Sequence, residues 1–188
     1  VGDMAINVED DVDKEEGLLD RSLLAAEKVG DDFAITRTLL FAGWVPWTRD
    51  RFDQAEVIWR RALALAGTKD RWARVRALTS LSINQMETKS FDEALRLIEE
   101  ASVIDEETGD QFSVAVTAVQ KGRVFEDLGR FHESVQWIDK GMAIFTQMGG
   151  TWELDDARTE PGSSKRTMGG SDGATADVRS AVRDYGEV

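Results

Sequence analysis

The 188-residue chain contains no cysteine and a single histidine, His132. The absence of cysteine excludes disulfides, a thiolate nucleophile and any cysteine-ligated metal site. One histidine also excludes a zinc site built from several histidines. No apolar run approaches the roughly 20 residues that a membrane-spanning helix needs, and the acidic N-terminus does not resemble a signal peptide. We therefore expect a soluble, cytoplasmic protein with no membrane partner.

Acidic residues outnumber basic ones by 36 to 23, which gives a net charge of -13. A surface of this sign repels phosphate backbones, so nucleic-acid binding is not expected. The charge is uneven, because residues 37–76 hold nine basic residues against four acidic ones. This segment is where an acidic partner would dock. The alternative interpretation is that arginines such as Arg60, Arg61 and Arg71 lie on solvated helix faces and pair with nearby acids.

Apolar residues recur at steps of three and four, the period of one face of an α-helix. Residues 51–67, 90–104 and 130–145 all show this pattern, and no segment alternates with period two for long. Ser90 and Asp53 predict helix starts, whereas the Gly-Asp pairs at Gly30 and Gly109 predict helix ends. With only two prolines in the chain, the pattern predicts an all-α fold.

A repeat of 39–40 residues relates these helices. Three sets of small residues recur at this spacing: Gly43, Ser82, Gly122 and Gly162; Ala55, Ala94, Ser134 and Ala174; and Ala62, Ala101, Gly141 and Ala181. Two antiparallel helices approach closely only where small residues face each other. One hairpin cannot bury its apolar faces alone, so neighbouring hairpins must stack. The repeat predicts a right-handed superhelical solenoid of about four antiparallel helix hairpins.

The spacing resembles the tetratricopeptide repeat (TPR). In that family a small residue in the first helix is followed by an aromatic residue and then by alanine, a bulky residue and alanine on the second helix. The first copy here is Gly43, Phe52, Ala55, Trp59 and Ala62. The period of 39–40 residues exceeds the usual repeat of about 34 residues. This longer period is similar to that of the variant found in bacterial signalling ATPases and transcription regulators.

The chain departs from the family pattern at Pro46, Lys121 and Gly141, and Pro46 predicts a kink or stop in its helix. We expect residues 1–14 to form an acidic N-terminal segment or remnant helix, and residues 15–150 to form the TPR-like repeats. Residues 151–188 are expected to be a degenerate, partly frayed repeat, because Pro161 falls within a helix interior. Residues 14–32 resemble the second helix of a shortened copy, so we expect the chain to be a piece of a longer protein.

The resemblance implies that the first helices of the hairpins line a concave groove that holds a peptide or ligand. The repeat maps the following residues to that groove: Arg37, Leu40, Trp44, Trp47, Arg76, Thr79, Ile83, Met86 and Arg123. Val116, Val119 and Glu126 are the further positions of the third copy. Tryptophan and arginine are enriched in binding hot spots, and Arg37 and Arg76 can grip a carboxylate. The alternative is that Trp44 and Trp47 pack against a partial preceding hairpin.

No catalytic constellation is visible, because His132 follows a turn and no motif places a nucleophile near it. We expect no enzymatic activity, no cofactor and no metal. The leading hypothesis is a non-catalytic protein- or peptide-binding module whose partner is a protein or peptide. The alternative is a ligand-sensing regulatory segment of a larger bacterial signalling ATPase or transcription regulator. Exposed hairpins at the ends of the solenoid would also favour self-association.

Overall fold

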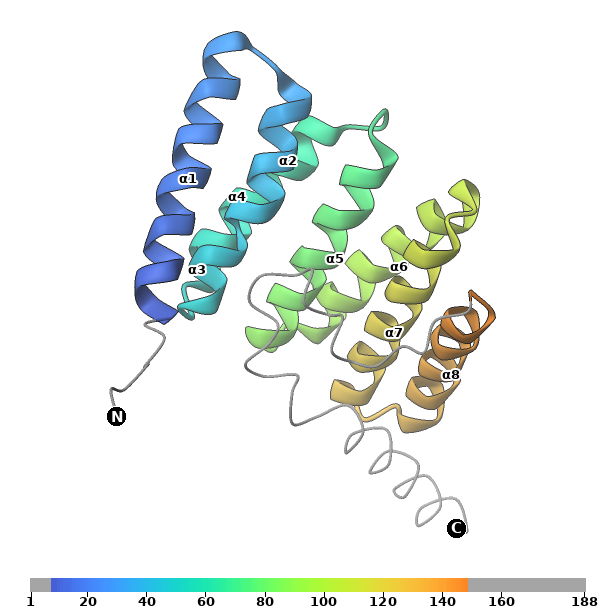
Figure 1. Cartoon of the computed structure of the whole chain (residues 1–188). Coiled ribbons are helices and arrows are strands. Elements are labelled where there is room, and N and C mark those ends of the chain that lie inside the picture. The colour runs from blue at the N-terminus through green and yellow to red at the C-terminus, as the bar shows by residue number, and fades with distance from the viewer. Residues whose placement is uncertain (1–7, 149–188) are drawn as a thin grey trace, which may run out of the picture.

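The computed structural model describes residues 8–148, with side chains from residue 17 onward, and within this range all regular structure is helical (Figure 1). The helices are α1 (Val8–Val29), α2 (Asp32–Ala42), α3 (Trp44–Thr48), α4 (Phe52–Ala66), α5 (Arg71–Glu87), α6 (Phe91–Thr108), α7 (Gln111–Asp127) and α8 (Phe131–Gln147). The degenerate repeat predicted for residues 151–188 lies outside the described residues, as do residues 1–7 of the predicted acidic segment.

Neighbouring helices pack in antiparallel pairs along the chain. We call α2, α5 and α7 the A helices and α4, α6 and α8 the B helices. Each A helix packs on the B helix that follows it, and α4 and α6 also pack on the next A helix. The A helices touch one another as well, since α5 contacts both α2 and α7. Figure 1 shows this succession running from α1 to α8. The predicted all-α solenoid of helix hairpins is confirmed.

The small residues that define the repeat lie where helices touch. All six non-glycine members in the described range are completely buried: Ala55, Ala62, Ser82, Ala94, Ala101 and Ser134. A Cβ atom on Gly122 would come within 2.5 Å of Ile138 Cγ1, and one on Gly43 would collide with the Trp59 ring. Because no room remains for a larger side chain, these positions set the distance between the paired helices, as the repeat predicted.

Three departures from the family pattern now have a structural reason. At Gly141, where the family prefers alanine, a Cβ atom would lie 2.8 Å from the carbonyl oxygen of Ala115. Lys121 replaces a leucine, but its ammonium group lies 4.3 Å from the centre of the Trp137 ring and 3.3 Å from Glu99. The ring and the carboxylate together compensate for burying this cation.

The third departure is the proline in the first copy. The first helix ends at Ala42, and Pro46 lies in the separate short helix α3. A proline is tolerated in the first turn of a helix, because the missing N–H has no partner there in any case. The predicted interruption of this helix is confirmed, and it begins at Gly43.

In each Gly-Asp pair the glycine follows the end of one helix and the aspartate caps the start of the next. Gly30 and Gly109 adopt the left-handed conformation, with φ of 73° and 71°, after α1 and α6. The aspartates that follow them cap the next helix, since Asp31 accepts a hydrogen bond from the amide of Ala34. Of the two predicted start signals, Ser90 stands at an N-cap without a side-chain cap bond, and Asp53 lies one residue inside α4.

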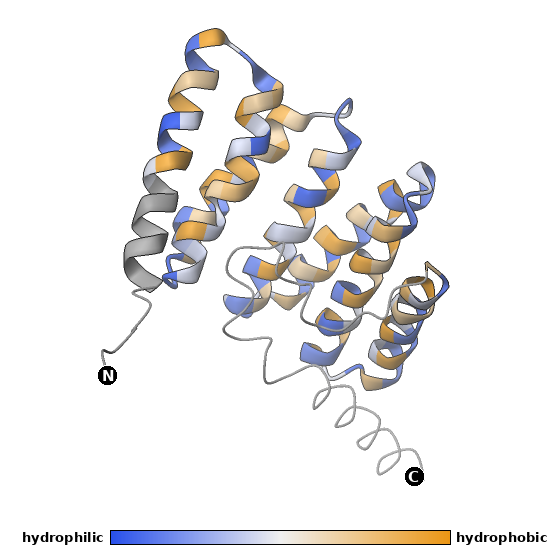
Figure 2. Ribbon diagram, in the orientation of Figure 1, coloured by the Kyte–Doolittle hydropathy of each residue, from blue (hydrophilic) through white to orange (hydrophobic). Residues whose placement is uncertain are grey.

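The core consists of two clusters of buried residues, one formed by α1, α2, α4 and α5 and the other by α3 to α7. Trp59, Leu78, Leu81 and Ile98 are fully buried in one cluster that joins α4, α5 and α6. In Figure 2 apolar and polar residues alternate along the helices, as expected where one face is buried and the other is solvated.

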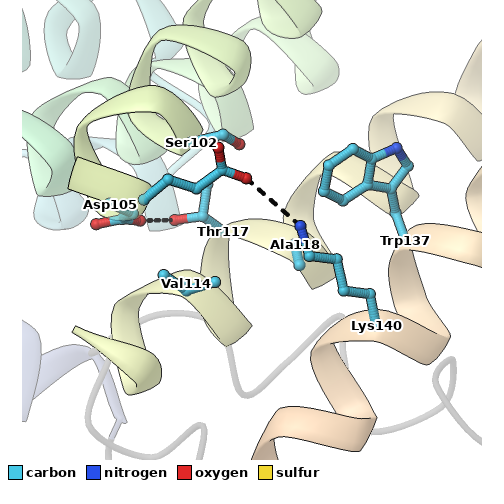
Figure 3. A pocket seen from close by; sticks show the side chains of 8 residues that line it. Ser102, Asp105, Val114, Thr117, Ala118, Trp137 and Lys140 are labelled. Carbon is cyan, nitrogen blue, oxygen red and sulfur yellow. Dashed lines mark hydrogen bonds and ion pairs between the residues drawn. The ribbon is translucent and has the colours of Figure 1, made fainter. Parts of the chain in front are cut away.

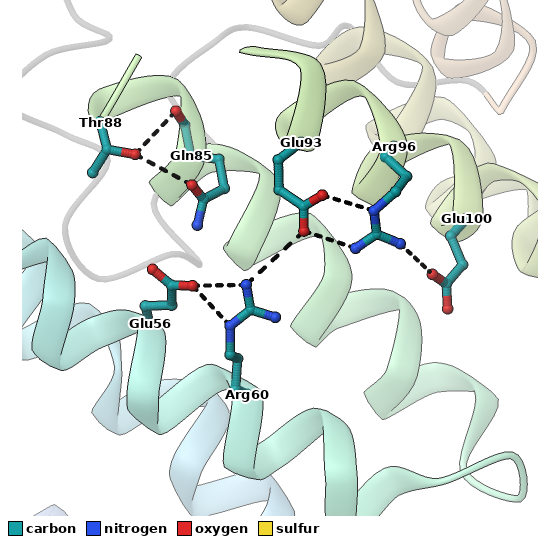
Figure 4. Close-up of polar contacts among 7 residues, drawn as sticks. All are labelled: Glu56, Arg60, Gln85, Thr88, Glu93, Arg96 and Glu100. Carbon is teal, nitrogen blue, oxygen red and sulfur yellow. Dashed lines mark hydrogen bonds and ion pairs between the residues drawn. The ribbon is translucent and has the colours of Figure 1, made fainter. Parts of the chain in front are cut away.

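Ion pairs between exposed side chains link several of the helices (Figure 4). Arg60 contacts Glu56 at 2.7 Å and Glu93 at 3.9 Å, which links α4 to α6. Arg61 pairs with Glu27, and Arg71 pairs with Glu107. The alternative interpretation of the basic segment therefore holds for these arginines, because their charges are compensated within the chain. Exposed pairs of this kind contribute little to stability.

Asn84 is a polar residue in an apolar position of the repeat. It is fully buried, and neither atom of its amide group has a hydrogen-bond partner among the described residues. The equivalent residues of the other copies are Val45 and Val124, both buried.

We expect Asn84→Val to raise the free energy of unfolding by about 1–3 kcal/mol, because it removes an unpaired buried amide. Denaturant unfolding of the two proteins tests this. The reciprocal change Val124→Asn is the control and should destabilise the protein. A less stable Asn84→Val protein would mean that the amide has a partner in solution.

Candidate binding surface

The structure divides the nine predicted groove residues into two groups. Four are buried, with exposed fractions of 8% or less: Leu40, Trp44, Trp47 and Thr79. Five are partly exposed: Arg37, Arg76, Ile83, Met86 and Arg123. Only the second group can offer side-chain surface to a partner.

The two tryptophans form part of the hydrophobic core. Trp44 lies edge-on to Trp47 and to Trp59, with ring centres 5.2 Å and 5.0 Å apart. Their cluster includes Val75 and Leu78 of the following hairpin. They therefore pack within their own hairpin and against the next one. Gly43, between α2 and α3, has helical backbone angles, with φ of -63° and ψ of -24°, and its amide still donates to the carbonyl of Leu39 at 3.1 Å. The sequence pattern did not reveal that both tryptophans face the core.

Arg37 is engaged within the chain. Its guanidinium lies 4.4 Å from the ring centre of Phe33 and 4.0 Å from that of Trp72, and it pairs with Asp70 at 3.1 Å. The Arg76 guanidinium lies 5.9 Å from the centre of the same Trp72 ring. The structure thus brings both predicted arginines to Trp72, but Asp70 of this chain takes the carboxylate position at Arg37.

The remaining candidates form what we call the A-helix surface. It consists of partly exposed side chains of α5 and α7, helices that contact each other: Arg76, Ile83, Met86, Val116, Val119 and Arg123. Ile83 and Met86 pack against the edge of the core. Burial lowers the pKa of both Arg76 and Arg123 below the ordinary value of an arginine. The surface therefore combines apolar contact area with two partly desolvated cations.

A second polar site lies between α6, α7 and α8 (Figure 3). Asp105 is 2% exposed and accepts hydrogen bonds from Ser113 Oγ at 2.7 Å and Thr117 Oγ1 at 2.5 Å. Beside it is a cavity of about 10 Å³, also lined by Trp137 and Lys140. This volume holds at most one water molecule. Burial raises the pKa of Asp105, against the opposing effect of the two hydroxyl donors. Sequence reasoning missed this residue, because the repeat places it among apolar positions.

We expect Asp105→Asn to stabilise the protein more at neutral pH than near pH 4. Since the folded protein holds the Asp105 proton more tightly, stability from this group is complete below the unfolded pKa of about 3.9 and is lost as pH rises through the folded pKa. Asparagine stays neutral over this pH range, and its amide oxygen can still accept a hydrogen bond from Thr117. Unfolding of both proteins across pH 4–7 gives the difference. A difference that stays constant or shrinks with rising pH would contradict the assigned pKa direction.

The part of the chain that the structure describes contains neither a metal-binding cluster nor a helix suited to cross a membrane. No group of three or more histidine or acidic side chains in residues 17–148 is arranged to hold a metal ion. In the same part of the chain, no helix has the length and apolar character required to cross a membrane.

Three solved structures show the wider relationship of this fold. BtubC (BKLC) from P. vanneervenii matches with a TM-score of 0.63 and 18% identity, over 74% of this chain and 59% of that one. The apo form of RapI matches with a TM-score of 0.70 and 12% identity, over 95% of this chain and 46% of RapI. The TPR-like repeats of a putative kinesin light chain from Podosopora anserina match with a TM-score of 0.62 and 16% identity, over 92% and 85%.

No family model matches the chain, and no curated protein sequence matches it. The chain spans about three fifths of BtubC and less than half of RapI. At these identities the likeness is one of fold. The chain has the fold of the TPR-like helical-repeat proteins.

Proposed function

We propose that the chain is a non-catalytic protein- or peptide-binding module and that the A-helix surface is its binding site. The observation that supports this most is the composition of that surface. Adjacent helices present apolar side chains and two cations that the hairpin packing leaves partly exposed. Partly exposed apolar area next to arginine is the composition typical of interface hot spots.

The two arginines favour a partner that carries acidic residues. A guanidinium stays charged even where burial removes part of its hydration. The lowered pKa of Arg76 and of Arg123 therefore indicates cations with incomplete hydration. An incoming carboxylate gains more from such a cation than from a fully hydrated one. The charge of Glu126 raises the pKa of Arg123 from one helical turn away, so a partner's carboxylate should approach Arg123 from the side away from Glu126.

Selection from a display library of random twelve-residue peptides tests the proposal. We expect the enriched peptides to combine apolar with acidic residues. Binding of a labelled enriched peptide, followed by fluorescence anisotropy, should weaken about tenfold in Arg123→Gln and in Ile83→Ser, a loss typical of a hot-spot residue.

The matched controls carry the same substitutions elsewhere. Arg71→Gln removes an arginine that pairs with Glu107, and Val57→Ser changes an apolar residue that is 70% exposed on α4. Both should bind the peptide as the unmodified chain does. Equal binding by all four variants would place the site elsewhere, and the absence of any enriched peptide would contradict the proposed function.

A further inference from the structure

The same chain contains a short sequence whose composition matches the ligand expected for the A-helix surface. It lies after α8, in residues 149–188, which are outside the described residues. Two large apolar residues, three acidic residues and no basic residue follow one another there: Trp152, Glu153, Leu154, Asp155 and Asp156. Beyond residue 157, no five consecutive residues hold more than two acidic ones. We call residues 152–156 the WELDD segment.

The end of α8 places the WELDD segment within reach of the A-helix surface. Phe145, near the end of α8, contacts Phe112 at the start of α7, with ring centres 5.8 Å apart. Val116 and Val119 of the A-helix surface lie about 6 and 10 Å further along α7 than Phe112. Four to eight extended residues after Met148 reach about 14–28 Å. This is enough to pass around a helix, which is about 10–12 Å wide.

Apolar side chains that the core leaves partly exposed lie on both helices of the surface. Ile83 and Met86 of α5 pack against the edge of the core, and Val116 and Val119 of α7 are also partly exposed. The two helices contact each other, so these side chains border one surface. Tryptophan gains more than most residues from burial against such a surface. Trp152 and Leu154 therefore match its apolar part.

The charges of the surface favour carboxylates at its end beside the start of α7. Arg76 lies there, at the repeat position equivalent to Val116. Two aspartates also stand at the starts of these helices, but Asp70 pairs with Arg37 at 3.1 Å and Asp110 caps α7. The acidic residues at the opposite end of α5 and α7 are Glu87, Glu126 and Asp127. The acidic side chains of the WELDD segment are therefore complementary to the end of the surface that is closer to α8.

We propose that the WELDD segment binds the A-helix surface of its own chain and competes there with a partner's peptide. This inference rests on the proposed function and adds its regulation, because a partner must displace the segment before it binds. A tethered ligand faces an effective concentration on the order of 1 mM. With a dissociation constant of about 0.1 mM, the segment would occupy the surface about 90% of the time and weaken a competing peptide about tenfold.

Binding of the enriched peptide described above, measured with the full chain, tests the competition. The double variant Trp152→Ser with Leu154→Ser should bind that peptide about tenfold more tightly than the unmodified chain. The matched control, Tyr185→Ser with Val182→Ser, changes apolar residues further along the chain and should leave the affinity unchanged. Peptide binding that depends on Ile83 but not on Trp152 and Leu154 would overturn this inference and leave the proposed function standing.

Methyl resonances of Ile83 and Val119 test the contact without any peptide. An indole ring shifts the resonances of methyl groups packed against it, so Trp152→Ser should move both, whereas Tyr185→Ser should move neither. Both substitutions lie outside the described helices, and circular dichroism should show unchanged helical content.

Three results of these measurements would overturn the proposal. The first is a pair of Ile83 and Val119 resonances that do not move in Trp152→Ser. The second is a shift at Ile144 of α8 but not at Ile83, which would place the segment on the last hairpin as a fourth repeat. The third is self-association of the chain in analytical ultracentrifugation that Trp152→Ser abolishes, which would make a second copy the occupant of the surface.

Discussion

Replacing Trp59 by alanine is expected to lower the free energy of unfolding by about 3–5 kcal/mol, among the largest effects of any single truncation in this chain. Trp59 is fully buried, its ring centre lies 5.0 Å from that of Trp44, and its Nε1 donates a hydrogen bond to the carbonyl of Leu40 at 3.1 Å. It fills the space between the small residues that let α2 and α4 approach. The alanine variant leaves a cavity that the rigid helix pairs cannot close.

Denaturant unfolding measures this loss, and Trp72→Ala is the matched control. Trp72 is 45% exposed, and its closest cation contact is with Arg37 at 4.0 Å. Its removal should cost only about 1 kcal/mol. Similar losses for the two variants would show that Trp59 is not the residue that fills the space between these helices.

Gly122→Leu should lower the free energy of unfolding by about 3 kcal/mol or more, because a side chain of this size forces the backbone to move. Even a single Cβ atom there would lie 2.5 Å from Ile138 Cγ1 and 3.0 Å from the carbonyl oxygen of Ser134. A whole leucine can enter only if α7 and α8 separate, which would expose the face that this last described hairpin buries.

Gly17→Leu makes the same change on α1, where a Cβ atom meets nothing within 4 Å. Leucine is a better helix former than glycine, so this control should be neutral or slightly stabilising. Thermal unfolding of the two variants gives the comparison. A Gly122→Leu protein that melts with the unmodified chain would refute the close approach of α7 and α8.

The sequence predicted the helix pairs well because their packing leaves few solutions. Where backbones nearly touch, only glycine, alanine or serine fits. The small size of Gly122 and Ser134 therefore predicts from the sequence where the two helices approach closely. The turns were less visible. Asp50 and Lys89 adopt left-handed conformations, with φ of 57° and 63°, at the repeat positions where the third copy has Gly129. Only the glycine gave a signal.

The candidate site was harder to predict, because the exposure of a side chain depends on which helices pack around it. The apolar pattern of one helix does not show those neighbouring helices. Trp44 and Trp47 have the composition of a hot spot, yet they lie in the core, where Trp44 packs on Trp59. The exposed aromatic residues Phe33 and Trp72 did leave a signal, since each follows a capping aspartate by two residues. The spacing from aspartate to aromatic residue marks exposed positions, whereas the helical period of apolar residues predicts only which positions are buried.

The most direct test of the solenoid is a set of three distances between spin labels on the B helices. Val57, Arg96 and Gln136 are exposed and occupy equivalent repeat positions, and the chain has no cysteine to interfere with labelling at introduced cysteines. Paramagnetic resonance should give equal distances for the pairs 57–96 and 96–136, and a clearly longer distance for 57–136. A 57–136 distance as short as the other two would show that the hairpins cluster instead of stacking, and would contradict the account.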